Sequence, residues 1–139
     1  MQAVSFKKID LTDGFWREKQ TLIGKVTLRS IYQQFVDTHR FDAFAHQWNE
    51  KMDWRPHPYW DSDVAKVMEA ACYLLGKNQG EAWMAQLCVQ IMDTFEAHQW
   101  PDGYFNSYYT LTDPAHRFTN RNDHELRSEE HTSELQSLV

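Results

Sequence analysis

The sequence predicts an all-α fold on three observations. Apolar residues recur at i, i+3, i+4 and i+7 in three segments, which is the spacing of one helix face. The chain carries no alternating apolar and polar pattern of the kind a strand would need. Proline and glycine clusters separate the periodic segments. At 139 residues the chain has the length of one ordinary domain.

The first periodic segment follows an extended entry. Residues 5 to 16 carry apolar side chains at irregular spacing, and Asp13-Gly14 is a turn signal. From about Arg17 to about His39 the pattern predicts one amphipathic helix. Its apolar face carries Leu28, Ile31, Tyr32 and Phe35.

A loop from about residue 49 to 60 leads into the second helix, because two prolines exclude a helix there. Asp61 or Ser62 supplies the expected N-cap oxygen, and Asp63 adds negative charge where the helix dipole favours it. Gly76 is expected to end this helix. The apolar face carries Val64, Val67, Met68, Ala71, Cys72 and Leu75.

After a four-residue connection a third helix is expected, antiparallel to the second. Its apolar face carries Met84, Leu87, Cys88, Ile91, Met92 and Phe95. The motif Pro101-Asp102-Gly103 predicts a tight turn that stops the pattern. From there to Leu126 we expect a polar, aromatic loop.

Composition excludes two classes of partner. The formal net charge is -6 and no basic stripe is present, which argues against nucleic acid. No stretch of about 18 or more apolar residues exists, so we expect no membrane span. The first residues lack the basic and apolar regions of a signal peptide, and we therefore expect a soluble, cytoplasmic protein.

Acids and aromatic rings gather where the helices begin and end. Such an arrangement suits a sugar, because its apolar face packs on a ring while carboxylates bind its hydroxyls. Tyr59, Asp61 and Asp63 are the candidate substrate-binding residues here. Helix capping, the alternative role, needs only one of the two aspartates. Side chains at i and i+2 diverge, so this pair is not expected to serve as acid and nucleophile on one bond.

Four motifs in order resemble the N-terminal part of glycoside hydrolase family 127, the β-L-arabinofuranosidase-like family. They are LTDGFW at 11–16, WDSDV at 60–64, QWPDGYFNSYY at 99–109 and DHEL at 123–126. The resemblance implies the first helices of an incomplete (α/α)6 barrel. It also implies hydrolysis of terminal β-L-arabinofuranosyl or related pentosyl residues of plant-type glycans. His124 stands at the position of a sugar-contacting histidine, and its other interpretation is a solvated loop residue.

The resemblance implies a zinc-bound cysteine thiolate as nucleophile, with a glutamate as acid and base. Those positions have no match in this chain, so we assign no catalytic residue and no metal ligand. Cys72 and Cys88 do not match them and are expected to be buried thiols on apolar helix faces. This chain is therefore predicted to lack activity by itself.

The last residues have a different character. Residues 127 to 137, RSEEHTSELQS, resemble the translation of a common sequencing adapter, codon for codon. We therefore assign residues 1–126 to the N-terminal part of the barrel domain and treat 127–139 as an artefactual tail. A natural polar tail is the alternative.

Two other functions stay open. Another (α/α)-barrel sugar enzyme, such as an unsaturated glucuronyl hydrolase, would share the helical hairpins and the aromatic helix ends. A non-catalytic helical carbohydrate-binding or interaction module is the second alternative, and it would require a complete fold within this chain. The pattern leaves the oligomeric state undetermined.

Overall fold

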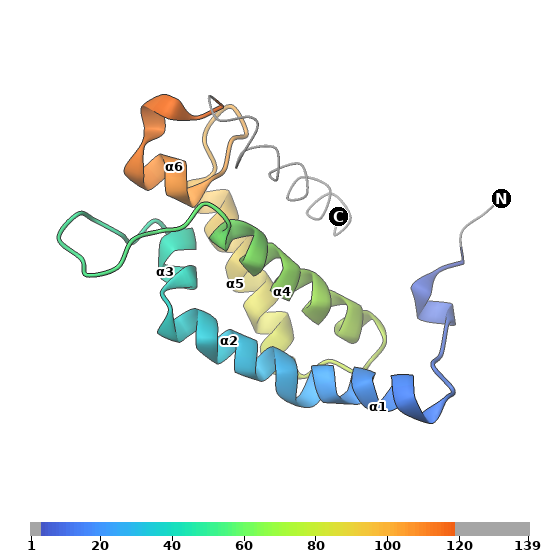
Figure 1. Ribbon diagram of the computed structural model, residues 1–139. Coiled ribbons are helices and arrows are strands. Elements are labelled where there is room, and N and C mark those ends of the chain that lie inside the picture. The colour runs from blue at the N-terminus through green and yellow to red at the C-terminus, as the bar shows by residue number, and fades with distance from the viewer. Residues whose placement is uncertain (1–3, 119–139) are drawn as a thin grey trace.

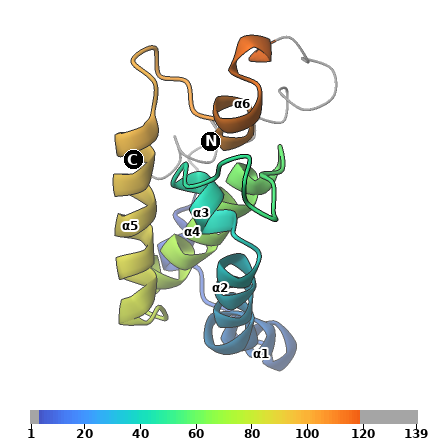
Figure 2. The ribbon, with the colours of Figure 1, turned by 90° about the vertical axis from the view of Figure 1, so that its left-hand side faces the viewer.

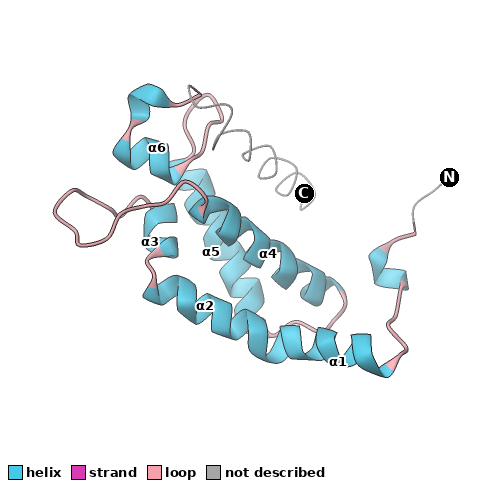
Figure 3. Ribbon diagram, viewed as in Figure 1, coloured by secondary structure: helices cyan, strands magenta, loops and turns pink. Residues whose placement is uncertain are grey.

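The computed structural model describes residues 4–118, and that part of the chain is helical with no strand (Figure 1, Figure 3). The predicted all-α class is confirmed. Within these residues no helix is both long and apolar enough to span a bilayer.

The first helical run is longer than predicted. Helix α1 (Gly14–Leu22) passes through a π-helical turn, Ile23–Thr27, into α2 (Leu28–Asp37) without a break. The run begins at Gly14 instead of about Arg17, because the Asp13 carboxylate accepts a hydrogen bond from the Trp16 N–H at 2.8 Å. The expected extended entry is also interrupted by a 3₁₀ turn, Phe6–Lys8.

The short helix α3 (Arg40–Phe44) was not predicted. The chain turns into it at His39, whose φ of 59° lies in the left-handed region. Five residues are too few to show a period, so burial of Ala43 and Phe44 in the core is what stabilises this helix. The loop predicted for 49 to 60 is confirmed up to the start of the next helix.

Helices α4 (Trp60–Gly76) and α5 (Ala82–His98) form the predicted antiparallel hairpin, and α4 ends at Gly76 as expected. The cap prediction was wrong. The helix starts at Trp60, and Asp61 and Ser62 lie inside its first turn instead of capping it. Figure 2 shows α4 between α5 and α2, which makes it the central element of the core. The shared core contains Leu28, Phe35, Val64, Met68, Ala71, Met84, Leu87 and Ile91.

The segment after α5 is more ordered than predicted. The tight turn is confirmed: the Gly103 N–H donates to the Trp100 carbonyl at 2.8 Å, and Gly103 has a φ of 87°. The expected loop beyond it instead contains α6 (Ser107–Thr112) and a 3₁₀ turn, Pro114–His116. The Asn106 side chain caps α6 by accepting from the Tyr109 N–H at 2.9 Å. The start of α4, the end of α3 and α6 thus meet at one end of the molecule (Figure 1).

Candidate functional site

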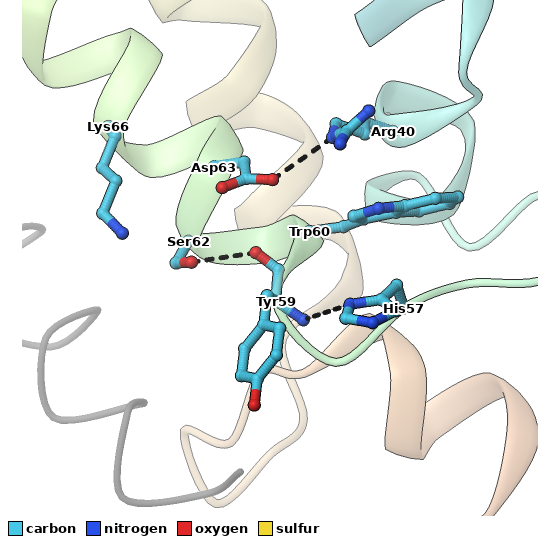
Figure 4. Close-up of a pocket in the computed structure, with 7 residues that line it drawn as sticks. All are labelled: Arg40, His57, Tyr59, Trp60, Ser62, Asp63 and Lys66. Atoms are coloured by element: carbon cyan, nitrogen blue, oxygen red, sulfur yellow. Dashed lines mark hydrogen bonds and ion pairs between the residues drawn. The ribbon is translucent and has the colours of Figure 1, made fainter.

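A cleft of about 470 Å³ opens at the N-terminal end of α4 (Figure 4). Its walls come from the start of α3, the end of the 45–59 loop and the first two turns of α4. The lining residues are Arg40, His57, Tyr59, Trp60, Ser62, Asp63 and Lys66.

An ion pair crosses the floor of this cleft. Arg40 Nε donates to Asp63 Oδ2 at 3.2 Å, and the Arg40 guanidinium also donates to the Thr38 hydroxyl. The same guanidinium lies 5.3 Å from the centre of the Trp60 ring and 5.0 Å from that of Phe35. Two hydrogen bonds and two ring contacts fix one orientation of Arg40. The cleft therefore holds a pre-oriented cation beside a carboxylate.

Aromatic rings of the 45–59 loop support Trp60 from outside. Trp54 lies 6.2 Å from Trp60, measured between ring centres, and stacks on the His39 ring at 4.7 Å. The Trp54 carbonyl accepts a hydrogen bond from Trp48 Nε1 at 2.5 Å. Trp60 is thus a braced ring on the cleft wall, with the flat surface that a sugar ring can pack on.

The other side of the cleft is polar. The Tyr59 N–H donates to His57 Nδ1 at 3.4 Å, and the Ser62 hydroxyl donates to the Tyr59 carbonyl at 2.8 Å. Figure 4 shows Lys66 reaching along the side of α4 that also bears Ser62, away from Arg40. Lys66 makes no salt bridge to any residue of the described part of the chain. The cleft thus offers donors and acceptors for hydroxyl groups on both sides.

Asp61, although predicted with Tyr59 and Asp63, does not line the cleft. It is 5 % exposed, and its two oxygens accept from the Ser107 N–H at 2.7 Å and the Ser107 hydroxyl at 2.6 Å. Burial raises the pKa of Asp61 to about 6, against the effect of the two hydrogen bonds from Ser107. The structure brings Tyr59 and Asp63 together in the cleft and directs Asp61 toward α6.

The sequence interpretation assigned neither of the two cations of the cleft, Arg40 and Lys66, to the site. Arg40 precedes Asp63 by 23 positions, and no local pattern links them. Lys66 could have been found, because it follows Asp63 by three positions on α4 and residues at this spacing are neighbours on a helix surface. His57, Trp60 and Ser62 also line the cleft, and the sequence interpretation assigned none of them a role in binding. His124, the fourth predicted substrate-binding residue, lies outside the described residues, as do Glu125 and the tail 127–139.

The zinc implied by the family resemblance does not fit the described residues. Between residues 4 and 118, no three or more His, Cys, Asp or Glu side chains are arranged to hold a metal. Cys72 and Cys88 are free and only partly buried, with 3.6 Å between their sulfur atoms. Cys72 is also too far from the cleft to share a metal with Asp63, because it lies nine positions further along α4, about 13 Å along the helix axis. We therefore derive no catalytic step through a metal from these residues.

An all-helical fold that gathers braced aromatic rings, a carboxylate and cations around an open cleft has the construction of a carbohydrate-active domain. A comparison with family models gives the particular family. The model described as "Beta-L-arabinofuranosidase, GH127 catalytic domain" matches residues 8–133. The chain belongs to this glycoside hydrolase family, whose catalytic domains are α/α barrels and whose substrates are glycans. No curated protein and no solved structure matches the chain.

Proposed function

We propose that this protein supplies the first helices of an (α/α)6-barrel glycosidase that removes terminal β-L-arabinofuranosyl or related pentosyl residues from plant-type glycans. The observation that carries the proposal is the family match over residues 8–133, which includes every residue lining the cleft. The antiparallel α4–α5 hairpin is the repeating unit from which such a barrel is built. The expected cytoplasmic location is part of the same proposal.

The cleft supports a role in holding the glycan. Trp60 presents a braced ring for the apolar face of a sugar. Asp63 uses Oδ2 for Arg40, which leaves Oδ1 to accept a hydrogen bond from a sugar hydroxyl. Arg40 is oriented by the same ion pair and can donate to a ring or glycosidic oxygen. In this proposal Tyr59 and Asp63 contact the substrate, while Asp61 positions α6.

Bond cleavage is assigned to groups outside this cleft. Among residues 4–118, Asp63 is the only carboxylate that lines it, and glycoside hydrolysis by carboxylates needs two, one on each side of the scissile bond. We therefore propose that the chain binds glycan without turning it over. An assay of the purified chain on an aryl β-L-arabinofuranoside, with zinc supplied, checks this: no release above buffer is expected. Release that a substitution within residues 1–126 abolishes would contradict it.

Binding is tested by titrating the chain with an L-arabinofuranosyl oligosaccharide and following tryptophan fluorescence, because Trp60 lines the cleft and Trp54 lies beside it. Asp63→Asn should weaken binding, since the substitution removes the ion pair with Arg40. Asp93→Asn, at an exposed position of α5, is the matched control and should bind as the wild type does. Equal affinity in all three proteins would reject the cleft as the glycan site. Preference for an unsaturated uronide would favour another (α/α)-barrel enzyme.

A further inference from the structure

Two thiols face each other across the central hairpin. Cys72 on α4 and Cys88 on α5 lie with their sulfur atoms 3.6 Å apart, and both are free. Both are partly buried and sit at the edge of the core cluster. The Cys88 thiol also lies 3.9 Å from the Met68 carbonyl of α4. Neither cysteine takes part in the proposed glycan cleft.

The separation is close to what a disulfide requires. A disulfide bond is about 2.05 Å long, so the sulfur atoms need to approach by about 1.5 Å. Rotation of the two side chains can provide part of that movement without unpacking the hairpin. The partner of each thiol is fixed, because α4 and α5 pack against each other through a connection of only five residues. Partial exposure gives a small oxidant access to the pair.

We propose that Cys72 and Cys88 are a redox modification site, at which a low-molecular-weight disulfide of the glutathione class converts the two thiols into one intramolecular disulfide. The inference goes beyond the proposed glycan binding and does not rest on it. It concerns the part of the α4–α5 hairpin near the connection between the two helices, whereas the cleft lies at the N-terminal end of α4.

The exchange balances in two steps. The Cys72 sulfur attacks the small disulfide as a thiolate, forms a mixed disulfide and releases one small thiol. The Cys88 sulfur then attacks the Cys72 side of that mixed disulfide, which forms the Cys72–Cys88 bond and releases the second small thiol. The two cysteines are oxidised, one small disulfide is reduced, and the two cysteine protons pass to the released thiolates.

The surroundings of the thiols indicate this order. Burial, and then the hydrogen bond and charge of Cys72, raise the pKa of the Cys88 thiol to about 12. Cys88 is therefore the poorer first nucleophile at neutral pH. Once Cys72 is held in a mixed disulfide, its contribution to that raised pKa is gone. Burial, the largest cause of the raised pKa, remains, and Cys88 serves as the resolving thiol because its sulfur lies 3.6 Å from that of Cys72.

The new bond would close a loop that contains the last turn of α4 and the first turns of α5. Cross-linking a loop of this length restricts the unfolded chain more than the folded one. We expect the melting temperature to rise by about 10 °C in the oxidised protein. The cleft residues stay where they are, so glycan binding should not depend on the redox state.

The test incubates the full chain with glutathione buffers of increasing oxidation and analyses it by intact mass and non-reducing peptide mapping. The expected product is a monomer that has lost two hydrogen atoms, has a Cys72–Cys88 linked peptide and melts at the higher temperature. Cys88→Ser should accumulate a stable glutathione adduct at Cys72, and Cys72→Ser should react much more slowly. Neither variant should show the rise in melting temperature that the disulfide gives the wild type.

Three results would overturn the proposal. One is a wild-type protein that retains both thiols in the most oxidising buffer. The second is a wild-type protein that stops at a single glutathione adduct. The third is a wild-type protein that forms only dimers linked between chains. Because both serine variants replace sulfur with a smaller oxygen, circular dichroism first confirms that each one retains the wild-type helix content.

Discussion

The carboxylate of Asp61, in the first turn of α4, accepts hydrogen bonds from both the backbone N–H and the hydroxyl of Ser107, the first residue of α6. The two distances are 2.7 and 2.6 Å, and both residues are buried. A carboxylate beside a helix N-terminus also satisfies N–H groups that the helix itself leaves free. This contact ties α6, only six residues long, to the end of the molecule that bears the cleft.

Removing the Asp61 carboxylate should therefore destabilise the protein through α6. Asp61→Ala leaves the buried Ser107 N–H without its acceptor, and such a loss typically costs about 1–3 kcal/mol of unfolding free energy. Asp61→Asn should retain most of the stability, because its amide can accept from the N–H and donate to the hydroxyl. Urea unfolding of Asp61→Ala, Ser107→Ala and the double variant measures the coupling. Additive losses would show that the two residues do not depend on each other.

The pH dependence of stability should contain two opposing contributions between about pH 4 and 6.5. Burial raises the pKa of Asp61 from 3.8 to about 6, so the folded protein holds this proton more tightly than the unfolded chain. Its contribution is present at low pH and is lost as the pH rises from about 4 to 6. Burial, and then His98, lower the pKa of His46 from 6.5 to about 4. That contribution is present above pH 6.5 and is lost as the pH falls toward 4.

Two variants separate these contributions. Asp61→Asn removes the first, so its stability should fall more steeply than that of the wild type as the pH drops from 6.5 to 4. His46→Asn removes the second and suits the left-handed backbone at that position, where φ is 53°. Its stability should fall as the pH rises from 4 to 6. Denaturant midpoints at half-unit pH steps measure both slopes, and identical profiles for all three proteins would refute both assignments.

Patterns within a short stretch of sequence predicted the two long helices of the hairpin but not the two short helices. Helices α4 and α5 carry long apolar faces, which predicted their type, while the short connection predicted their pairing and Gly76 predicted where α4 ends. Helices α3 and α6 are too short for a period, and they depend on contacts such as Asp61–Ser107 between residues 46 positions apart. The predicted cap at Asp61 failed because the helix already begins at Trp60, one residue before Asp61, and this carboxylate accepts hydrogen bonds from α6 instead.

The sequence likewise predicted only those residues of the candidate site that lie close together in the chain. Tyr59 and Asp63 were found from a local cluster of acids and rings, and both line the cleft. Arg40 was missed because its relation to Asp63 exists only after α3 packs on α4. The sequence also could not predict which partner each aspartate would have. Asp61 accepts a hydrogen bond from Ser107 and Asp63 accepts one from Arg40, and both partners are distant in the sequence.

Lys77 should hold the N-terminal segment on the end of α4. Its ammonium, on a side chain 9 % exposed, donates to the Ile9 carbonyl at 2.5 Å and to Asp10 Oδ1 at 2.8 Å. Lys77→Met retains the apolar stem and removes these bonds, so residues 4–10 should detach while the hairpin remains folded. Hydrogen exchange should speed up in that segment only. Lys51→Met, in the exposed loop, is the control, and unchanged exchange in Lys77→Met would exclude the anchoring role.

Arg40 should determine glycan affinity through its shape as well as its charge. The guanidinium serves Asp63 and Thr38 at once and lies against the Trp60 ring. Arg40→Lys retains the charge but cannot make both hydrogen bonds in the same plane. The loss of one such bond, about 1 kcal/mol, corresponds to roughly five-fold weaker binding of the arabinofuranosyl oligosaccharide.

The matched control is Arg29→Lys, which alters the ion pair with Glu81 on the surface between α2 and α5 and leaves the cleft intact. Fluorescence titrations of both variants, with circular dichroism to verify the fold, make the comparison. If both variants bind as tightly as the wild type, the planar guanidinium of Arg40 contributes nothing to glycan affinity beyond its charge. If both variants lose affinity equally relative to the wild type, the loss is not specific to the cleft, because Arg29 lies outside it. A selective loss in Arg40→Lys is the outcome that the Arg40–Asp63 geometry predicts.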